Sequence, residues 1–447
     1  MDFSRDNKYN DFATNFLMNI YKYFDRKYLN NKNAFTRKGK LSLEDTIKYP
    51  IVQCGHTNSK EANDYIKLIT GDDYEMITGQ AIGEKRGFIE PKVYEDMYKD
   101  YVDNFYDNYK EDITYKNRLW FAIDTTVIKV PNVSKCKEAF PVNEDNPARA
   151  RLSTVADVFT GMIFTDEIVE KNHGEVKLAI KHLKELVERK PNRKMCVTYD
   201  RGYCAFDILF THLYYGMDLL LRMDSRFLHK EIEQLPSDDE ILRININNKK
   251  TNAISNPEIR EYFEKEIYVD VRITKVEITK ANGETYIETL LSTLPMEEFS
   301  KEELKELYGY RWEIETDYDR LKNVLELENF TGQRRIIIEQ DIYSKIFILN
   351  LLLTIKIDAD KYIQEKRKDK NLKHEYQANL NHLLGTMHTF LYKLIECKSE
   401  EEREMISNQI LKEANQRLVL KKDDRIKDPR RHTGDTGAKH KSNDRLA

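Results

Sequence analysis

Residues 118–130 read RLWFAIDTTVIKV, and this run indicates the fold class of the chain. Its density of β-branched and aromatic side chains predicts a buried β-strand. Asp124 lies in the middle of the run. Burying a carboxylate costs free energy unless the group is hydrogen-bonded, paired or bound to an ion. Asp124 therefore indicates either a hydrogen-bonded structural group or a functional site.

The segments that follow this strand predict a mixed α/β layer. They read in order as a hairpin, an amphipathic helix and two further strands, over residues 150–170, 175–189, 194–200 and 217–224. The hairpin is expected to turn at Thr160-Gly161, and the second buried strand ends on Asp200. Because ligands bind at the carboxyl ends of strands in open α/β sheets, the position of Asp200 also favours a site. The pattern as a whole predicts an α/β fold class.

A later stretch, residues 308–332, reads YGYRWEIETDYDRLKNVLELENFTG and predicts a helix with two distinct faces. At about 100° per residue, one polar stripe with an arc of roughly 60° holds Tyr308, Arg311, Glu315 and Lys322. The neighbouring apolar face holds Leu307, Ile314, Tyr318, Leu321 and Leu325, which are expected to enter a core. The polar stripe is therefore expected at the edge of a buried region.

Three carboxylates without a pattern of His or Cys ligands favour a particular metal chemistry. Asp124, Asp200 and an acid of the later helix suit Mg²⁺ or Mn²⁺, which prefer oxygen ligands, and suit Zn²⁺ poorly. Two such ions about 4 Å apart activate the attacking hydroxyl and stabilise the leaving oxygen of a phosphodiester. The helical geometry leaves both Glu315 and Asp319 open as the third acid.

The flanking regions have different patterns from the α/β layer. The first part of the chain reads as helical, with a capping-box pattern that begins at Ser42 and a second possible helix cap at Thr78. Two strand patterns joined across Asn282-Gly283 predict a β-rich insertion. The expected organisation has six parts in chain order. A helical DNA-end-binding region (1–112) is followed by the first part of a catalytic core (113–225), the β-rich insertion (226–299) and the second part of the core (300–335). A helical C-terminal region (336–420) and a basic disordered tail (421–447) follow.

Composition limits the class of protein. The 447 residues are enough for two or three domains, and 34 % of them are charged, with a mean hydropathy of −0.70. The absence of a long apolar run predicts a cytoplasmic protein without a membrane partner. The net charge of −4 gives no global attraction for nucleic acid, so any such binding requires local basic patches. Five cysteines without a C-x-x-C pair indicate neither a disulfide framework nor a structural metal.

The spacing of Tyr308, Arg311, Glu315 and Lys322 resembles the Y-R-E-K signature of DDE insertion-sequence transposases of the IS-four-like group. The same family has similar residues around its first two acids, here AIDTT around Asp124 and YDRGY around Asp200. The resemblance covers residues 115–335, and it is weaker in FTRKGKLSLEDTIKYPI and QAIGEKRGF. The resemblance implies a ribonuclease-H-like catalytic core with a β-rich insertion between the second and third acids. It also implies that Asp124, Asp200 and Glu315 are the catalytic, metal-binding triad, with the motif spacing selecting Glu315.

The same resemblance implies an activity and its partners. The activity is cut-and-paste transposition, in which the protein binds the terminal inverted repeats of its element, cleaves them and joins them to target DNA with two Mg²⁺ ions, for which Mn²⁺ can substitute. A homodimer on DNA and a prokaryotic cytoplasm, with nucleoid association when DNA is bound, are expected. Tyr308, Arg311 and Lys322 are expected to hold the 5′ end and phosphates of the transposon strand.

Further DNA contacts are predicted from less specific patterns. Arg222 matches a family arginine and is expected either to reach a phosphate or to pair with a core acid. Gln80, Lys85 and Arg86 lie on a short helix that suits the recognition helix of a helix-turn-helix, although a plain helical bundle with solvated charges fits as well. Both tryptophans, Trp120 and Trp312, lie outside the insertion, so a flipped base would have to stack on one of the insertion aromatics, Tyr262, Phe263, Tyr268 or Tyr286.

Other functions use part of the same pattern. A ribonuclease-H-like nuclease that acts without transposition would use the same three acids but would not need a helical region that reads an end sequence. A non-catalytic DNA-binding descendant of a transposase would not need to retain costly buried carboxylates. A two-carboxylate glycosidase is disfavoured because Arg311 and Lys322 would lower, rather than raise, the pKa of an acid catalyst beside them.

Overall fold

The structure is a computed structural model that describes residues 7–37, 39–53, 55–71, 76–109, 111–141, 147–190, 193–279, 283–368 and 374–421. The tail predicted from residue 421 onward lies outside the described residues except for Lys421. Asn282 of the predicted insertion turn and Cys54 also lie outside them.

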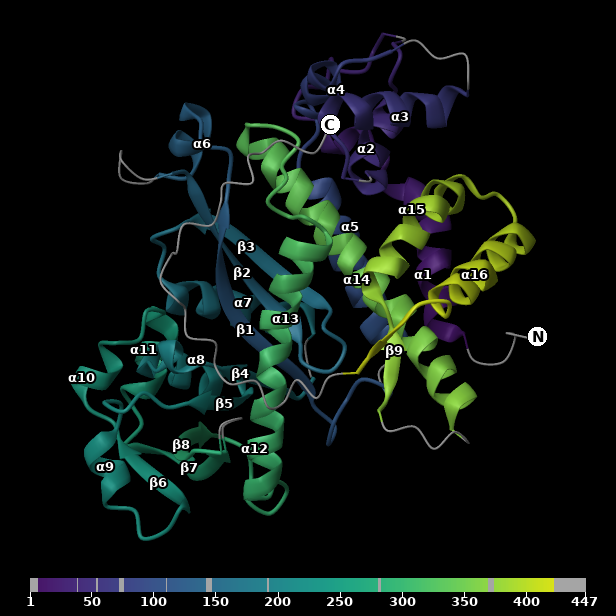
Figure 1. Ribbon diagram of the computed structural model, residues 1–447. Helices are drawn as coiled ribbons and strands as arrows, with labels where there is room; N and C mark the ends of the chain where they lie inside the picture. Colours follow the sequence, from purple (N-terminus) through teal and green to yellow (C-terminus); the bar gives the residue numbers. More distant parts are fainter. Residues whose placement is uncertain are drawn as a thin grey trace.

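The centre of the molecule is a mixed β-sheet (Figure 1). Its first five strands are β1 (Leu119–Lys129), β2 (Arg149–Asp157), β3 (Ile163–Glu170), β4 (Met195–Tyr199) and β5 (Asp218–Arg222). They lie in the order β3-β2-β1-β4-β5, with β1, β2 and β3 antiparallel and with β4 and β5 parallel to β1. This is the strand arrangement of a ribonuclease-H-like core, so the predicted fold class is confirmed.

The insertion continues the same sheet. It contains β6 (Asp239–Asn245), β7 (Tyr268–Thr279) and β8 (Thr285–Ser292), with three short helices, α9 (His229–Glu233), α10 (Asn248–Thr251) and α11 (Pro257–Phe263). Strands β7 and β8 form the predicted antiparallel hairpin. Strand β8 also pairs with β5, through Leu221 opposite Leu291, and the sheet therefore extends to eight strands.

Helices cover both faces of the sheet. Ser153 and Thr154 are neighbours on β2, and successive side chains of a strand point to opposite faces. The hydroxyl of Ser153 contacts His182 of α7 (Glu175–Arg189), whereas that of Thr154 donates to Tyr318 of α13 (Glu313–Asp319). The sheet therefore lies between α7 and the helix that carries Glu315. Helix α8 (Phe206–Tyr215) packs beside α7.

The acid-bearing segment is less regular than the predicted helix. It consists of α12 (Lys301–Gly309), a 3₁₀ turn (Tyr310–Trp312), α13 and a π turn (Arg320–Val324). A 3₁₀ turn is tighter than an α-helix and a π turn is wider, so their effects on the rotation of the side chains oppose each other. The predicted apolar face is accordingly kept: Leu307, Ile314, Tyr318 and Leu321 are buried, and Leu325 is half-buried.

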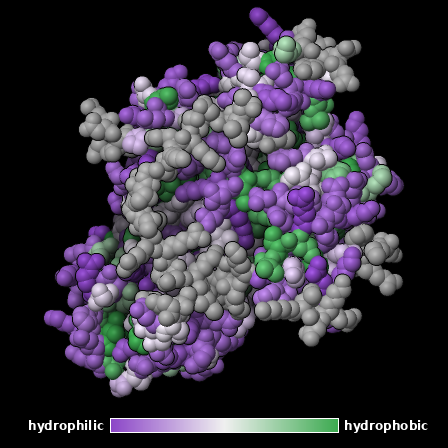
Figure 2. All heavy atoms as spheres, in the orientation of Figure 1, coloured by the Kyte–Doolittle hydropathy of each residue, from purple (hydrophilic) through white to green (hydrophobic). Residues whose placement is uncertain are grey.

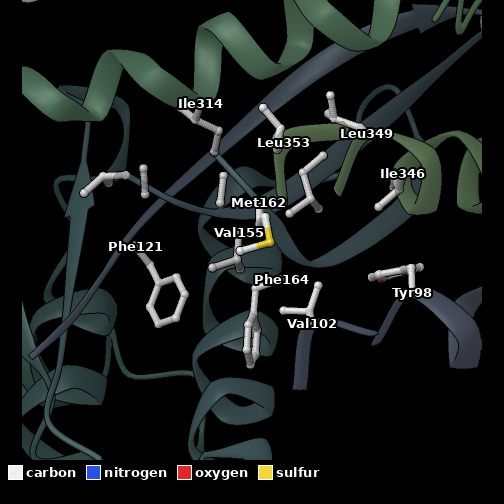
Figure 3. Packing of buried hydrophobic residues seen from close by; sticks show 14 of the residues in the cluster. Tyr98, Val102, Phe121, Val155, Met162, Phe164, Ile314, Ile346, Leu349 and Leu353 are labelled. Carbon is white, nitrogen blue, oxygen red and sulfur yellow. The ribbon is translucent and has the colours of Figure 1, made fainter. Parts of the chain in front are cut away.

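One continuous apolar core joins the sheet to the helices (Figure 3). Figure 3 shows Ile314 of α13 among side chains from the sheet and its β2–β3 turn, from α5 (Lys92–Asn108) and from the long helix α14 (Arg335–Arg367), namely Phe121, Val155, Met162, Phe164, Tyr98, Val102, Ile346, Leu349 and Leu353. Burying each such side chain contributes about 1.5 to 3 kcal/mol. The core therefore fixes the position of the helix that carries the third acid.

Helices from the two ends of the chain pack together, although more than 300 residues separate them (Figure 1). Helix α1 (Lys8–Met18) contacts α14, α15 (Leu380–Glu396) and α16 (Glu400–Ala414). Buried Asp358 of α14 accepts hydrogen bonds from the backbone N–H groups of Tyr9 and Asn10 at 2.9 and 2.8 Å. The side chain of Asn10 in turn donates to the Ser407 hydroxyl at 2.6 Å.

The remaining N-terminal helices are α2 (Leu43–Val52), α3 (Asn58–Thr70) and α4 (Gly79–Arg86). The predicted caps are both confirmed. Ser42 forms a capping box with Asp45 at the start of α2, and the Thr78 hydroxyl accepts a hydrogen bond from the Ala81 N–H at the start of α4.

The surface shown in Figure 2 is mostly hydrophilic, with scattered apolar patches. None of the helices in the described part of the chain combines the length and the apolar character that a membrane span requires.

Candidate active site

Three acids from distant parts of the sequence converge on one face of the sheet. Ala122 pairs with Thr198 across the parallel strands β1 and β4, so Asp124 and Asp200, each two residues further on, come level with each other. Asp124 lies opposite Thr154 of β2, and side chains of such cross-strand partners share a face. Thr154 contacts α13, so Asp124 faces the helix that carries Glu315.

Two arginines hold these acids within one charged cluster. Arg311, only 2 % exposed, lies 3.1 Å from the Glu315 carboxylate and 3.9 Å from that of Asp124. Arg222 of β5 lies 3.7 Å from Asp200 and 2.9 Å from buried Glu288 of β8. Arg222 therefore pairs with core acids in this structure, and its contact with a DNA phosphate stays a prediction.

The charge balance of the cluster appears in the pKa of Asp124. Burial raises this pKa to about 7, and the negative charges of Glu315 and Asp200 add to the rise, while Arg311 and the Thr125 N–H oppose it. Like charges that raise a carboxyl pKa lie close enough to repel one another. A divalent cation bound between these acids would relieve that repulsion.

The donor atoms fit a hard divalent cation. All three side chains are carboxylates, and Oδ1 of Asp200 is buried and has no hydrogen-bond partner within the described part of the chain. Within the described ranges, no three His, Cys, Asp or Glu side chains already stand close enough together to hold an ion. Arg311 instead supplies the positive charge between Asp124 and Glu315. The chemistry that bound divalent ions supply is activation of the attacking oxygen and stabilisation of the leaving oxygen of a phosphodiester.

Asp319, the alternative third acid, has a different environment. The pKa of Lys322 is lowered by burial, and the negative charges of Glu328 and Asp319 oppose that fall, whereas Glu315 is the acid that interacts with Asp124. Both carboxyl groups are exposed on the same helix. The structure therefore brings Glu315 to the other two acids and leaves Asp319 beside a lysine.

Tyr308 lies inside the cluster rather than on its rim. Its side chain is buried, and its hydroxyl has no hydrogen-bond partner among the residues that the structure describes. Burial raises the pKa of Tyr308 well above its usual value, with Asp200 and Glu288 adding to the rise and Arg311 and Arg222 opposing it. The guanidinium of Arg311 lies over the ring of the next residue, Trp312, at 4.4 Å from the ring centroid.

Lys322 extends the site along β1. Its ammonium group donates to the Thr126 hydroxyl at 2.6 Å and to the Val127 carbonyl at 3.0 Å. Burial lowers the pKa of Lys322, and the nearby charges of Lys129 and Arg149 also contribute to this effect. Lys129 and Arg149 are cross-strand partners, so three cations gather at this end of β1 and β2.

The three residues predicted on α4 have different environments. Gln80 is exposed and donates to Glu84, and Lys85 is half-buried with its ammonium 5.0 Å from the Phe35 ring centroid. Arg86 is 1 % exposed and binds Gln340 at 2.9 Å, Asp341 at 2.7 Å and the Thr331 hydroxyl. The expectation that Arg86 contacts DNA does not fit this burial, because its guanidinium is used to join α4 to α14.

The insertion aromatics also differ in position. Phe263 is buried, and Tyr262 and Tyr268 are exposed. The Tyr286 hydroxyl donates to Glu288 at 3.2 Å, which connects it through Arg222 to the site.

Two acids near the site were not found from the sequence. Glu175, in the first turn of α7, accepts a hydrogen bond from the Thr125 hydroxyl at 2.9 Å and pairs with Arg151. Glu288 pairs with Arg222. The sequence does not single out Glu175, because an acid in the first turn of a helix is an ordinary feature. It does not single out Glu288 either, because the position of Glu288 depends on the pairing of β8 with β5, for which there is no local sequence signal.

Comparison with known proteins places the chain in a family. Residues 116–351 match the family described as the transposase DDE domain. No match was found among curated proteins. Among solved structures, the cryo-EM structure of the piggyBac transposase synaptic complex with hairpin DNA is similar, with 11 % sequence identity, coverage of 91 % of this chain and 86 % of that chain, and a TM-score of 0.40. The family match spans more than half of the chain and includes Asp124, Asp200 and Glu315, and the protein therefore belongs to the transposase DDE-domain family.

Proposed function

We propose that this DDE transposase binds the ends of its own insertion sequence and moves the element by metal-dependent strand cleavage and strand transfer. The observation that supports this function most directly is the convergence of Asp124, Asp200 and Glu315 on one face of the sheet, beside two arginines. Enzymes of this family generally depend on divalent metal ions. In the proposed reaction, the three acids hold two Mg²⁺ ions, for which Mn²⁺ can substitute.

The cations around the acids supply contacts for the DNA strand. Lys322, Lys129 and Arg149 form a basic cluster at one end of the site. Tyr308, Arg311 and Arg222 lie on the side of Asp200 and Glu315. In the proposed complex, the basic cluster contacts phosphates of the transposon strand, and the second group contacts the phosphate at its cleaved end. Arginine suits the latter position because its planar fork binds phosphate oxygens bidentately.

A groove beside α4 is the proposed seat for the terminal repeat. It has a volume of about 1060 Å³ and lies between α4, the segment 331–337 and α6 (Ser134–Ala139). Amide and cationic side chains line it together, from Gln80, Lys85, Lys135, Gln333 and Arg334. Amides read base edges, and cations neutralise phosphates, so the lining suits recognition of a DNA end.

The proposed function is tested on the DNA that flanks this reading frame. Purified protein is incubated with end fragments and Mg²⁺, and nicking, joining and the mass of the protein–DNA complex are measured. We expect end-specific cleavage and a complex of two subunits that holds two ends. Cleavage without end specificity would instead identify a nuclease, and end binding without cleavage a non-catalytic descendant. A cutting-competent complex of a single subunit on a single end would contradict the proposed homodimer.

Lys322→Ala is expected to weaken DNA binding. Loss of one well-desolvated charged contact costs on the order of 1.5 to 3 kcal/mol of binding free energy. The slope of log affinity against log salt concentration is expected to decrease in magnitude by about one unit. Affinity for an end fragment is measured by gel shift at several salt concentrations.

Lys184→Ala is the control for this measurement, because Lys184 is an exposed lysine on α7, across the sheet from α13. An unchanged affinity and salt slope in Lys322→Ala, together with reduced thermal stability, would show that Lys322 only supports β1 through Thr126 and Val127.

A further inference from the structure

The hydroxyl of Tyr318 connects the acid-bearing helix directly to the strand of the first acid. It donates a hydrogen bond to the backbone carbonyl of Asp124 at 2.6 Å and accepts one from the Thr154 hydroxyl at 2.9 Å. Thr154 is the cross-strand partner of Asp124, so one phenol hydroxyl contacts both members of that pair. Tyr318 is buried, which protects both hydrogen bonds from competition with water.

This connection lies at the level of the catalytic acids. Tyr318 follows Glu315 by three residues on α13, and residues at this spacing are neighbours on a helix surface. The ladder between β1 and β4 ends at Ala122, two residues before Asp124. The Tyr318 hydroxyl therefore holds the backbone of Asp124 just beyond the end of its pairing with β4.

A separate network of charged side chains lies on α13 and the turn that follows it. Arg320 lies 2.6 Å from the carboxylates of both Glu313 and Asp317. The turn at Gly161 closes over this network: a Cβ atom at residue 161 would lie 2.8 Å from the Arg320 guanidinium, and the φ angle there is +73°. This network packs against the β2–β3 turn, whereas the Tyr318 hydroxyl joins α13 to β1 at Asp124 itself.

We propose that Tyr318 is a positioning residue that sets the separation between Glu315 and Asp124 and thereby the geometry of the divalent-ion site. This inference rests on the proposed function, in which these acids bind the ions. Tyr318 itself contacts neither ion nor DNA; it acts through the Asp124 backbone and through the helix of Glu315. Partners that orient metal ligands typically contribute roughly 10- to 100-fold to metal affinity or activity.

The test uses Tyr318→Phe in the full chain, which removes one oxygen atom and leaves the ring. The affinity of the DNA-free protein for Mn²⁺ is measured by calorimetry and is expected to fall about tenfold. In cleavage assays, kcat is expected to fall by a similar factor, with KM for the DNA end unchanged. Tyr94→Phe is the matched control, because Tyr94 is a buried tyrosine whose hydroxyl donates to the Ile47 carbonyl at 3.0 Å, in the N-terminal helical region. Tyr318→Phe loses two buried hydrogen bonds and Tyr94→Phe loses one, but only Tyr318→Phe is expected to change Mn²⁺ affinity.

Thr154→Val provides a second measurement on the same hydrogen-bond chain. It removes the bond that Tyr318 accepts, and Mn²⁺ affinity is expected to fall about threefold, whereas Thr154→Ser retains the donor and the affinity. The double variant Tyr318→Phe/Thr154→Val is expected to be no weaker than Tyr318→Phe alone, because both substitutions act on one chain. If Tyr318→Phe does not fold, an unchanged Mn²⁺ affinity in Thr154→Val overturns the proposal.

Asp124→Asn separates the two levels of inference. One outcome contradicts only the role of Tyr318: the wild-type protein binds Mn²⁺, Asp124→Asn does not, and Tyr318→Phe binds it as tightly as the wild type. The proposed ion site then stands. If the wild-type protein and Asp124→Asn bind Mn²⁺ equally, or if neither binds it, the acids are not the ion site and both proposals fail.

Discussion

Asp124→Asn, Asp200→Asn and Glu315→Gln are each expected to abolish strand cleavage and joining while end binding stays nearly unchanged. Each substitution removes a charged metal ligand without changing the size of the side chain. Stabilisation of transition-state charge by the metal is worth several kcal/mol, so the cleavage rate should fall on the order of a thousandfold or more. Binding is retained because the proposed groove at α4 lies apart from the acids.

Cleavage is measured as Mg²⁺-dependent nicking, and binding by gel shift on the same end fragment. Asp319→Asn is the matched control, because Asp319 is an exposed acid one turn from Glu315 on the same helix and interacts with Lys322 instead. It is expected to cut at the wild-type rate. A Glu315→Gln variant that still cuts, together with an inactive Asp319→Asn, would transfer the role of third acid to Asp319.

The same variants have a second expected effect in the absence of metal. The three carboxylates repel one another in the metal-free site, and replacing one of them by an amide removes part of that repulsion. Thermal stability without metal is therefore expected to rise slightly. Folding of each variant is confirmed in the same measurement, so loss of cleavage is not attributed to unfolding.

Arg86→Ala is expected to cause the largest loss of stability. The substitution leaves Asp341, which is only 2 % exposed, without the guanidinium that it pairs with at 2.7 Å. Removal of one partner from a buried ion pair costs about 3 to 5 kcal/mol of unfolding free energy, because the other charge remains buried and unpaired. Urea unfolding of the wild-type protein and the variant measures this difference. The double variant Arg86→Met/Asp341→Leu is expected to recover most of the loss, since it removes both charges.

Lys85→Ala, one residue away on α4, is the matched control, because it is expected to reduce DNA affinity rather than stability. Lys85 is half-buried and lines the proposed DNA groove, so its loss should weaken end binding with little change in stability. Binding by Arg86→Ala is measured at a temperature at which the variant is folded, and it is expected to equal that of the wild type. If Arg86→Ala instead has wild-type stability and reduced DNA affinity, Arg86 contacts DNA as first predicted.

The sequence by itself determined the features that depend on neighbouring residues. The strand at residues 118–130, the hairpin at Thr160-Gly161 and the caps at Ser42 and Thr78 were predicted because each depends on side chains within a few positions. The closeness of Asp124 and Asp200 could also be predicted from the sequence, because each lies in or directly after a buried strand. In the structure, these two strands are parallel neighbours.

Tertiary structure alone decided which arginine pairs with which acid. Arg86 had the appearance of a surface cation, yet α14, more than 250 residues later, buries it against Asp341. Glu288 reaches Arg222 only because β8 pairs with β5, and Arg311 lies between Asp124 and Glu315 because the core holds α13 against β1. Periodicity reports which face of an element is apolar, but it contains no information about which distant element covers that face. The partner of a buried charge is set by that long-range packing, and a single sequence therefore predicts the acids of this site better than the cations around them.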